Sequence, residues 1–209
     1  MKPITRLALM SNNADKLAEL KQLLHDIDLE VVPYQSITHC EIDVVEDGVT
    51  YEENALKKVM APPNAEGVIY LADDSGLEVK QLNNSPGIYS ARFAGENCSY
   101  EDNCLKILSY LGEESQRQAS FHCHIALRFP TSTPLSPSVI KGEVHGNIIH
   151  TPASLKGFGY DPIFIPNGHT EPFSALSSEI KNKISHRGKA LDKTKTRLIK
   201  LLQDLHAAV

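Results

Sequence analysis

The first thirty residues alternate between two patterns of hydrophobicity, and this alternation constrains the fold more than any other feature. A strand candidate over 4–10 is followed by a polar break at 11–13. Leucines then recur at helical spacing over 17–24, and a second strand candidate spans 29–32. The order strand, helix, strand favours an α/β fold.

The rest of the chain continues this mixture of helices and strands. Thr50 and Glu53 have the spacing of a capping box, and the helix that they begin ends before Pro62. Another helix is predicted from Ser99, with Leu105, Leu108 and Leu111 on its apolar face, and a last one over 188–205. Strands are predicted over 68–71, 77–79, 120–129, 139–144 and 163–165. The chain has no internal repeat and no low-complexity linker, which favours one domain over 1–209 with a mixed sheet.

Composition and charge exclude several classes of protein. Hydrophobic residues make up 41% of the chain, which is ample for a core, and the net charge is −5. No Lys/Arg block is long enough to follow a phosphate backbone, so a nucleic-acid polymer is disfavoured as a partner. No apolar run approaches the length of a membrane span, and the N-terminus does not read as a signal peptide. We therefore expect a cytoplasmic protein without a membrane partner, whose four cysteines are buried thiols: Cys40, Cys98, Cys104 and Cys123.

The polar break after the first strand is a candidate phosphate site. Free backbone N–H groups and a partial positive charge lie at a helix N-terminus, and a lysine in the first turn adds a full charge. The alternative is an ordinary helix cap with the lysine facing solvent. The residues concerned are Ser11, Asn12, Asn13, Ala14, Asp15 and Lys16.

Two adjacent carboxylates, Asp73 and Asp74, come directly after the apolar run 68–71. Side chains alternate along a strand, so the two point to opposite faces and only one enters a given site. A carboxylate there suits Mg²⁺ or the activation of a water, although Asp-Asp-Ser-Gly is also composed of turn-forming residues. The acidic residues upstream are either a solvated face or the source of a second metal ligand: Glu41, Asp43, Glu46, Asp47, Glu52 and Glu53.

Two further segments are candidates for binding a ligand. In 157–162, glycines flank an aromatic residue, so Phe158 or Tyr160 is a candidate to stack on a nucleobase and Asp161 to hydrogen-bond to it. A plain glycine-rich loop is the alternative. In 181–188, four groups are cationic if His186 is protonated, and the alternative there is a basic surface turn.

Six motifs in order give the chain a family resemblance. They are SNNADK at 11–16, TYEENALKK at 50–58, LADDSGLEV at 71–79, SPGIYSARFAG at 85–95, GFGYDPIF at 157–164 and ISHRGKAL at 184–191. With these motifs the chain resembles the inosine triphosphate pyrophosphatase family over nearly its whole length.

The resemblance implies a fold and an activity. The fold is a long, mixed, twisted sheet flanked by helices, with two lobes and the active-site cleft between them. The activity is Mg²⁺-dependent hydrolysis of ITP, dITP and XTP to the monophosphate and pyrophosphate, in a homodimer. Residues 11–16 would hold phosphates, Asp74 would be the acid–base and metal residue, and Ser75 would contact the substrate. The base would meet Phe158, Gly159, Tyr160, Asp161, Lys181, His186 and Arg187.

The chain departs from the family pattern at the second metal ligand. Val45 stands where a carboxylate is usual, so the metal ligand is predicted to be the adjacent Glu46, with Glu53 or water as alternatives. Asn12 also stands where glycine is common. Two other functions stay open: a related pyrophosphatase with a different base preference, and a nucleotide-binding protein that has lost catalysis. Asp73 is expected to face away from Asp74 and to accept hydrogen bonds from the backbone or a lysine.

Overall fold

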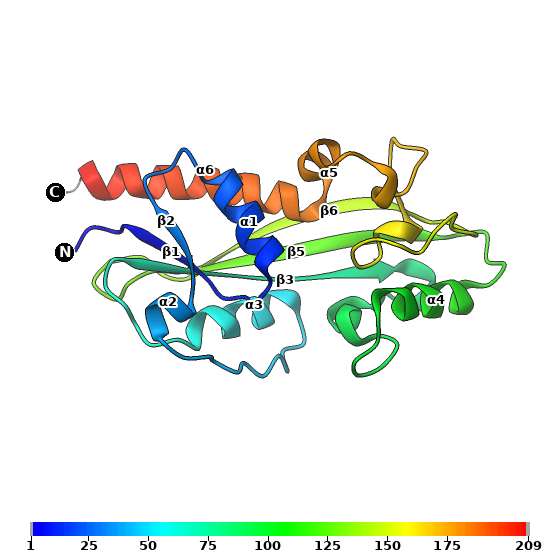
Figure 1. Cartoon of the computed structure of the whole chain (residues 1–209), viewed down its shortest axis with the longest axis horizontal. Helices are drawn as coiled ribbons and strands as arrows, with labels where there is room; N and C mark the ends of the chain where they lie inside the picture. The colour runs from blue at the N-terminus through cyan, green and yellow to red at the C-terminus, as the bar shows by residue number, and fades with distance from the viewer. Residues whose placement is uncertain (1, 208–209) are drawn as a thin grey trace. The chain divides into compact units, whose positions relative to one another are not determined.

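The computed structural model describes residues 2–207, without the side chains of Asp15, His206 and Ala207. A seven-stranded sheet runs in the order β2-β1-β3-β5-β6-β7, with β4 paired to β3. β1 is parallel to both β2 and β3, whereas β3 with β4 and β6 with β7 are antiparallel. The predicted α/β fold with a mixed sheet is confirmed (Figure 1). The strands are β1 (Arg6–Leu9), β2 (Glu30–Pro33), β3 (Val68–Val79), β4 (Ser85–Pro86), β5 (Gln118–Arg128), β6 (Ser138–Ile148) and β7 (Phe164–Pro166).

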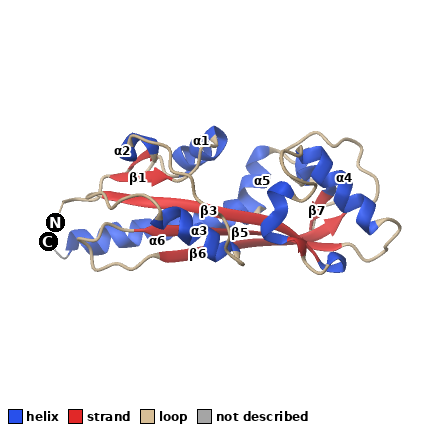
Figure 2. Ribbon diagram, turned by 90° about the horizontal axis from the view of Figure 1, so that it is seen from below, coloured by secondary structure: helices blue, strands red, loops and turns tan. Residues whose placement is uncertain are grey.

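Helices connect these strands, as the colouring by secondary structure in Figure 2 shows. They are α1 (Ala14–Leu23), α2 (Gln35–Thr38), α3 (Tyr51–Met60), α4 (Tyr100–Leu111), α5 (Ser178–Ile184) and α6 (His186–Ala207). Short 3₁₀ turns are η1 (Lys80–Leu82), η2 (Gly87–Arg92), η3 (Asp161–Ile163) and η4 (Phe173–Ala175). Of the helices described, none combines the length and the apolar character needed to cross a bilayer.

The chain divides into two compact units. Unit 1 comprises Met1–Asp74, His124–Lys141 and Ala190–Val209, and unit 2 comprises Ser75–Cys123 and Gly142–Lys189. The boundary therefore falls within β3, between Asp74 and Ser75. The single domain over 1–209 and the cleft between two lobes stay predictions.

Unit 1 is built around the start of β3. β1 pairs with it in the register Leu7↔Ile69, and on its other side β1 pairs with β2 in the register Leu7↔Val31. α3 has the predicted N-cap, because the Thr50 side chain accepts a hydrogen bond from the backbone N of Glu53, but the Glu53 side chain accepts from Val49 N instead of completing the capping box. Its buried Ala55 and Val59 join the sheet in one core, together with Ala8, Met10, Tyr34, Val68, Tyr70, Ala72 and Ala126.

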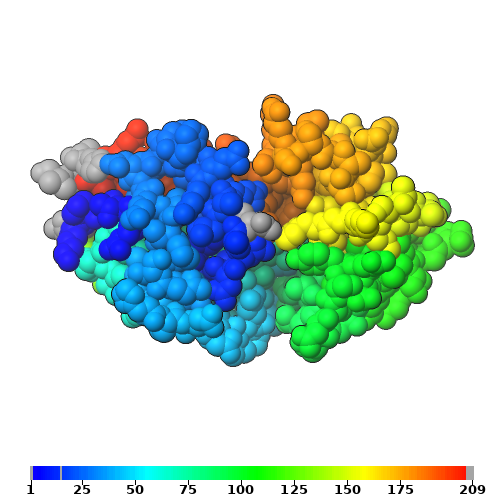
Figure 3. Space-filling model, in the orientation of Figure 1, coloured from blue at the N-terminus to red at the C-terminus, as the bar shows by residue number. Residues whose placement is uncertain are grey.

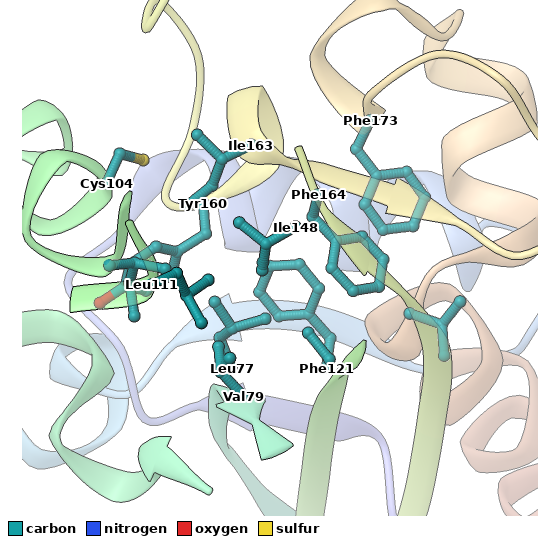
Figure 4. Packing of buried hydrophobic residues seen from close by; sticks show 13 residues of the cluster. Leu77, Val79, Cys104, Leu111, Phe121, Ile148, Tyr160, Ile163, Phe164 and Phe173 are labelled. Carbon is teal, nitrogen blue, oxygen red and sulfur yellow. The ribbon is translucent and has the colours of Figure 1, made fainter. Parts of the chain in front are cut away.

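Unit 2 has an aromatic core, shown in Figure 4. The ring centroids of Phe121 and Phe164 lie 4.8 Å apart, and those of Phe164 and Phe173 lie 5.3 Å apart. Leu77, Val79 and residues of α4 complete this core. Aromatic pairs at these distances add about 0.5–1.5 kcal/mol each to the free energy gained by burial.

The predicted apolar face of α4 is wrong in one position. Leu111 is buried, but Leu105 is 48% exposed, and Cys104 and Ile107 face the core instead. Leu105 and Leu111 are six residues apart, about 1.7 helical turns, so they do not share a face. Residues spaced by three move progressively around an α-helix, because one turn takes about 3.6 residues.

Two further predictions need correction. The Asp-Asp-Ser-Gly segment is not a turn, because β3 is one strand of 12 residues that passes straight through it. The basic segment near 181 is not a surface turn, because α5 begins at Ser178 with its N-terminus capped by Ser177. The expectation of buried thiols holds for Cys104 and Cys123 and fails for Cys40, which is exposed, and Cys98, which is half-buried.

Candidate active site

The turn between β1 and α1 is a capped helix start. The Asn13 side chain accepts a hydrogen bond from the backbone N of Lys16 at 3.2 Å, and the backbone N of Asn13 donates to Ser11 Oγ at 3.2 Å. Asn12 Oδ1 accepts from Gln35 Nε2. The ordinary-cap interpretation of 11–16 is thus correct for Asn13, and Ala14 is the exposed first residue of the helix. The side chain of Asp15 lies outside the described part of the structure.

Lys16 does not simply face solvent. Its Nζ donates to both carboxylate oxygens of Asp73, at 2.8 and 2.9 Å. Asp73 is buried, so this ion pair is partly shielded from water. The expectation that Asp73 accepts hydrogen bonds from a lysine is confirmed.

Asp74 has different partners, as alternation along β3 requires. Asn54 Nδ2, from α3, donates to Asp74 Oδ2 at 3.2 Å. Lys58 Nζ, one helical turn further along α3, lies 3.5 Å from Asp74 Oδ1. The same Nζ donates to Glu46 Oε2 at 2.8 Å and to the Asp73 carbonyl oxygen at 2.9 Å. One ammonium therefore joins the two carboxylates that were predicted as metal ligands.

Burial sets the electrostatics of this group. The Asp74 side chain is 13% exposed and that of Lys58 is 15% exposed. Burial raises the pKa of Asp74 above its ordinary value, and the opposing effects of Lys58 and Asn54 do not cancel it. Burial alone would lower the pKa of Lys58, but the Asp74 and Glu46 carboxylates outweigh it, so this pKa is raised. A carboxyl group with a raised pKa is better suited to accept a proton from water.

Asn54 and Lys58 are site residues that the sequence reasoning missed. Their spacing of four residues within the TYEENALKK motif was the available signal, because it places both on one face of α3. Gly48 belongs to the same arrangement: its backbone N donates to Asn54 Oδ1 at 2.8 Å, and a Cβ at Gly48 would lie 2.5 Å from that oxygen. Only glycine allows this approach.

The carboxylates upstream of α3 differ in what they contact. Val45 is 70% exposed, so the position that usually carries the metal ligand has no buried contact here. Glu53 Oε2 accepts from the backbone N of Val49 at 2.8 Å, in the capping arrangement of α3. Glu46 is the acidic residue of this stretch that shares Lys58 with Asp74.

The carboxylates present could hold Mg²⁺ only if water and the phosphates of a substrate supplied its other ligands. Within residues 2–207, no group of three or more His, Cys, Asp or Glu side chains is arranged to hold a metal ion. Two carboxylates, from Asp74 and Glu46, converge on the Lys58 ammonium. Mg²⁺ is commonly bound through one or two carboxylates, with water and substrate phosphates as the other ligands. The residues present satisfy that requirement.

The two aromatic candidates, Phe158 and Tyr160, both lie in unit 2, but they differ in burial. Phe158 is 42% exposed, with Lys181 Nζ at 5.8 Å and the Arg187 guanidinium carbon at 5.9 Å from its ring centroid. Tyr160 is buried in the core, and its hydroxyl donates to the Ser90 carbonyl oxygen at 2.8 Å. The Tyr160 ring is therefore not exposed for stacking, and its contact with the base stays a prediction. Between them, Gly159 has a φ of +55°, a conformation that favours glycine.

The polar candidates of unit 2 come from η3, α5 and α6. Asp161 is buried and paired with Lys181. Burial raises the pKa of Asp161, opposed by Lys181 and Arg187. The His186 ring stacks on Phe121 at 4.6 Å between centroids and 7° between planes, so its orientation is set by the core. Ser75 is half-buried on β3.

Each unit thus presents one chemically distinct set. On the face in Figure 3, residues 11–60 (blue to cyan) make up most of the surface of unit 1. Its set is ionic: Lys16, Glu46, Lys58, Asp73 and Asp74. The set in unit 2 is an exposed phenylalanine with cations beside it and a buried Asp161–Lys181 pair. The set in unit 1 has chemistry suited to phosphates, and the set in unit 2 has chemistry suited to a planar ring.

The comparison with known proteins assigns the family. The chain belongs to the Ham1 family, whose model matches residues 7–197. It is 43% identical over 191 residues to a dITP/XTP pyrophosphatase of Streptomyces coelicolor, covering 90% of this chain and 94% of the relative. It is 39% identical over 192 residues to a dITP/XTP pyrophosphatase of Coxiella burnetii, covering 91% and 94%.

Solved structures agree with the fold. The structure of the Staphylococcus aureus Ham1 protein matches with a TM-score of 0.84 and 39% identity, over 93% of this chain and 98% of that chain. The resemblance predicted from the six motifs is confirmed at the level of the family.

Proposed function

We propose that this protein hydrolyses the non-standard purine nucleoside triphosphates ITP, dITP and XTP to the monophosphate and pyrophosphate, and so removes them from the nucleotide pool. Relatives about 40% identical over nine-tenths of the chain bear the name dITP/XTP pyrophosphatase. The single observation that carries the proposal is the placement of Lys58 Nζ 2.8 Å from Glu46 and 3.5 Å from Asp74. It brings a partly buried carboxylate, a second carboxylate and a cation together, an arrangement suited to phosphoanhydride hydrolysis.

Unit 1 would act on the phosphates. Asp74, held by Asn54, orients the attacking water and accepts its proton. Lys58 and Lys16 offset the negative charge on the phosphate oxygens, and the N-terminus of α1 offers backbone N–H groups. Asp74 and Glu46 would hold Mg²⁺, which when bound neutralises phosphate charge and orients the anhydride.

Unit 2 would act on the base. Phe158 offers a ring face for stacking, and Asp161 and Lys181 provide polar groups beside it. Donors in the region of Ser185, His186 and Arg187 would pair with the oxygen at purine C6. The amino group of adenine would meet those donors unproductively and leave buried polar groups unpaired, which disfavours ATP.

Steady-state kinetics on ITP, dITP, XTP and the standard triphosphates, with separate detection of pyrophosphate and orthophosphate, tests the proposal. We expect the highest kcat/KM on the three non-standard purines, with pyrophosphate as product, and loss of turnover in EDTA. Orthophosphate as the only phosphate product would overturn it. Preference for a modified pyrimidine would favour the related pyrophosphatase, and no turnover with any divalent metal would favour the non-catalytic homologue.

We propose for this chain the homodimer that the family resemblance implies and the cytoplasmic location expected from its sequence. Sedimentation equilibrium at micromolar concentration tests the first, and subcellular fractionation of the native host tests the second. A monomer across the concentration range would contradict the dimer.

A further inference from the structure

One face of α4 contacts the loop that carries Phe158 at two consecutive residues. The rings of Tyr100 and Phe158 lie 5.1 Å apart between centroids, with 59° between their planes. The Cys104 thiol, four residues along the helix, lies 3.4 Å from the Gly159 carbonyl oxygen and donates to it. Residues four apart share a helix face. α4 therefore supports this loop through an aromatic contact and a thiol hydrogen bond side by side.

The supporting residues are themselves fixed. Tyr100 is the first residue of α4, directly after a complete capping box: Ser99 Oγ accepts from the backbone N of Asp102 at 3.1 Å, and Asp102 Oδ2 accepts from the backbone N of Ser99 at 2.8 Å. Cys104 is fully buried, and burial raises the pKa of its thiol to about 12, so it keeps the proton that it donates. The start of α4 is thus a rigid base for the loop.

The contact between Tyr100 and Phe158 is exposed rather than part of the core. Tyr100 is 46% exposed and Phe158 is 42% exposed, whereas Tyr160 in the same loop is buried. Two large rings left at the surface in contact with one another gain little from burial, but each limits the orientation of the other. Lys181 and Arg187 lie near the same Phe158 ring, which draws cations to the site.

We infer that Tyr100 is a positioning residue for base recognition: it holds the Phe158 ring in the orientation that a purine base stacks upon. This inference rests on the proposed function and adds a residue to it. Tyr100 acts through Phe158, so its loss weakens binding of the base and leaves the phosphate chemistry of unit 1 unchanged.

The chain offers a matched control on the same helix. Tyr110 is also exposed, and its ring makes an edge contact with Phe93, 5.9 Å between centroids, rather than with Phe158. The same substitution at Tyr100 and Tyr110 removes one exposed tyrosine ring and its aromatic contact in each case. Only the first is in contact with the loop of Phe158.

Binding of inosine monophosphate can be measured by fluorescence, without turnover. The chain contains no tryptophan, so the signal of an introduced tryptophan reports on its site alone. Phe158→Trp introduces a single tryptophan at the stacking position, and titration with inosine monophosphate should quench its selectively excited fluorescence. In that background, Tyr100→Leu should weaken binding of inosine monophosphate by roughly 3- to 10-fold, the range of one aromatic contact. Tyr110→Leu should leave it within twofold, and Tyr100→Phe should restore it.

Kinetics on the chain without the tryptophan separate positioning from folding. Tyr100→Leu should raise KM for ITP by a similar factor while kcat stays within twofold and inhibition by tripolyphosphate is unchanged. Equal KM in Tyr100→Leu and wild type would overturn the inference, as would failure of inosine monophosphate to quench the Phe158→Trp variant. If the wild type does not hydrolyse ITP but Tyr100 still governs binding of inosine monophosphate, the proposed function fails and the inference stands.

Discussion

The ionic set of unit 1 and the aromatic set of unit 2 differ in how much water reaches them. In unit 1, Asp74 and Lys58 are shielded, and their charges act on each other and on any ligand with little screening. In unit 2, the Phe158 ring remains at the surface, where a flat ligand can cover it. In the proposed function, phosphate chemistry would use charge that is shielded from water, whereas recognition of a base would use an exposed face whose orientation is fixed.

The two sets also differ in what holds them. Asp73 and Asp74 lie on a long strand paired on both sides, and Lys58 and Asn54 lie on a capped helix. Phe158 lies in a loop that depends on its neighbours for its shape. Substitutions should therefore affect kcat in unit 1 and KM in unit 2, and this difference can be tested.

Asp74→Asn should have the largest effect. Removing the group that accepts the proton should lower kcat on ITP by roughly 10²- to 10⁴-fold. Binding of inosine monophosphate should be retained. Asp47→Asn is the control, because Asp47 lies next to Glu46 in the acidic stretch before α3 but is exposed and paired with Lys57. Equal loss in both variants would mean that Asp74 has no special role.

Lys58→Met should come next, with a fall in kcat of about 10²-fold because one preorganised cation is lost. The neighbouring Lys57→Met should keep near wild-type kcat, since Lys57 is exposed and contacts Asp47. Steady-state kinetics at saturating ITP give the comparison. A rise in KM alone for Lys58→Met would assign that residue to binding rather than to catalysis.

Phe158→Leu should mainly raise KM for ITP, by roughly tenfold, because stacking on a base is lost. The value of kcat should fall much less than in the unit 1 variants. Tyr89→Leu removes an exposed ring of unit 2 that contacts Arg92 and serves as the control. The contrast between the units breaks down if Phe158→Leu lowers kcat as strongly as Asp74→Asn.

Tyr160→Phe should cost stability rather than activity. The variant loses the buried hydrogen bond to the Ser90 carbonyl oxygen, which is worth about 1 kcal/mol. Tm should fall by about 2–4 °C, with KM for ITP unchanged. Phe158→Leu should show the opposite pattern in the same two measurements. An altered KM in Tyr160→Phe would place this side chain at the base after all.

The smallest effect expected is a gain in stability. Burial raises the pKa of Asp74 above 3.8, so the folded state favours the protonated form. The contribution of this group is fully present below the ordinary pKa of aspartate and is lost as pH rises through the raised pKa. Asp74→Asn should therefore be slightly more stable than wild type near pH 7, and the difference should vanish near pH 4. Urea unfolding across that range measures it, and a difference independent of pH would contradict the assignment.

The sequence was a good guide where local physics decides. Hydrophobic period predicted β1, α1 and β2 in order, and the helix starts at Thr50 and Ser99 follow from side chains that cap backbone N–H groups. Alternation along β3 predicted that Asp73 and Asp74 have different partners. α5 was missed because it is short and none of its residues is buried, so it lacks an apolar stripe.

The candidate site was only partly predictable, because part of it depends on contacts between residues distant in sequence. Asp74 and Phe158 are recognisable from motifs, but Lys58 and Tyr100 owe their proposed roles to contacts with residues distant in sequence. Lys58 contacts Asp74, and Tyr100 contacts Phe158. Tyr160 and Phe158 have equal claims to stacking in the sequence. In the structure Tyr160 is buried and Phe158 is exposed, with the left-handed Gly159 between them.

By itself, the sequence determined the family and the α/β class, because hydrophobic period, capping and ordered motifs are local properties of the chain. Only the tertiary structure decided which groups are neighbours and how far water reaches them. It joined Glu46 to Asp74 through Lys58, and it set Tyr100 against Phe158. Distance and burial control the strength of charge and of stacking, and neither is a property of any short stretch of sequence.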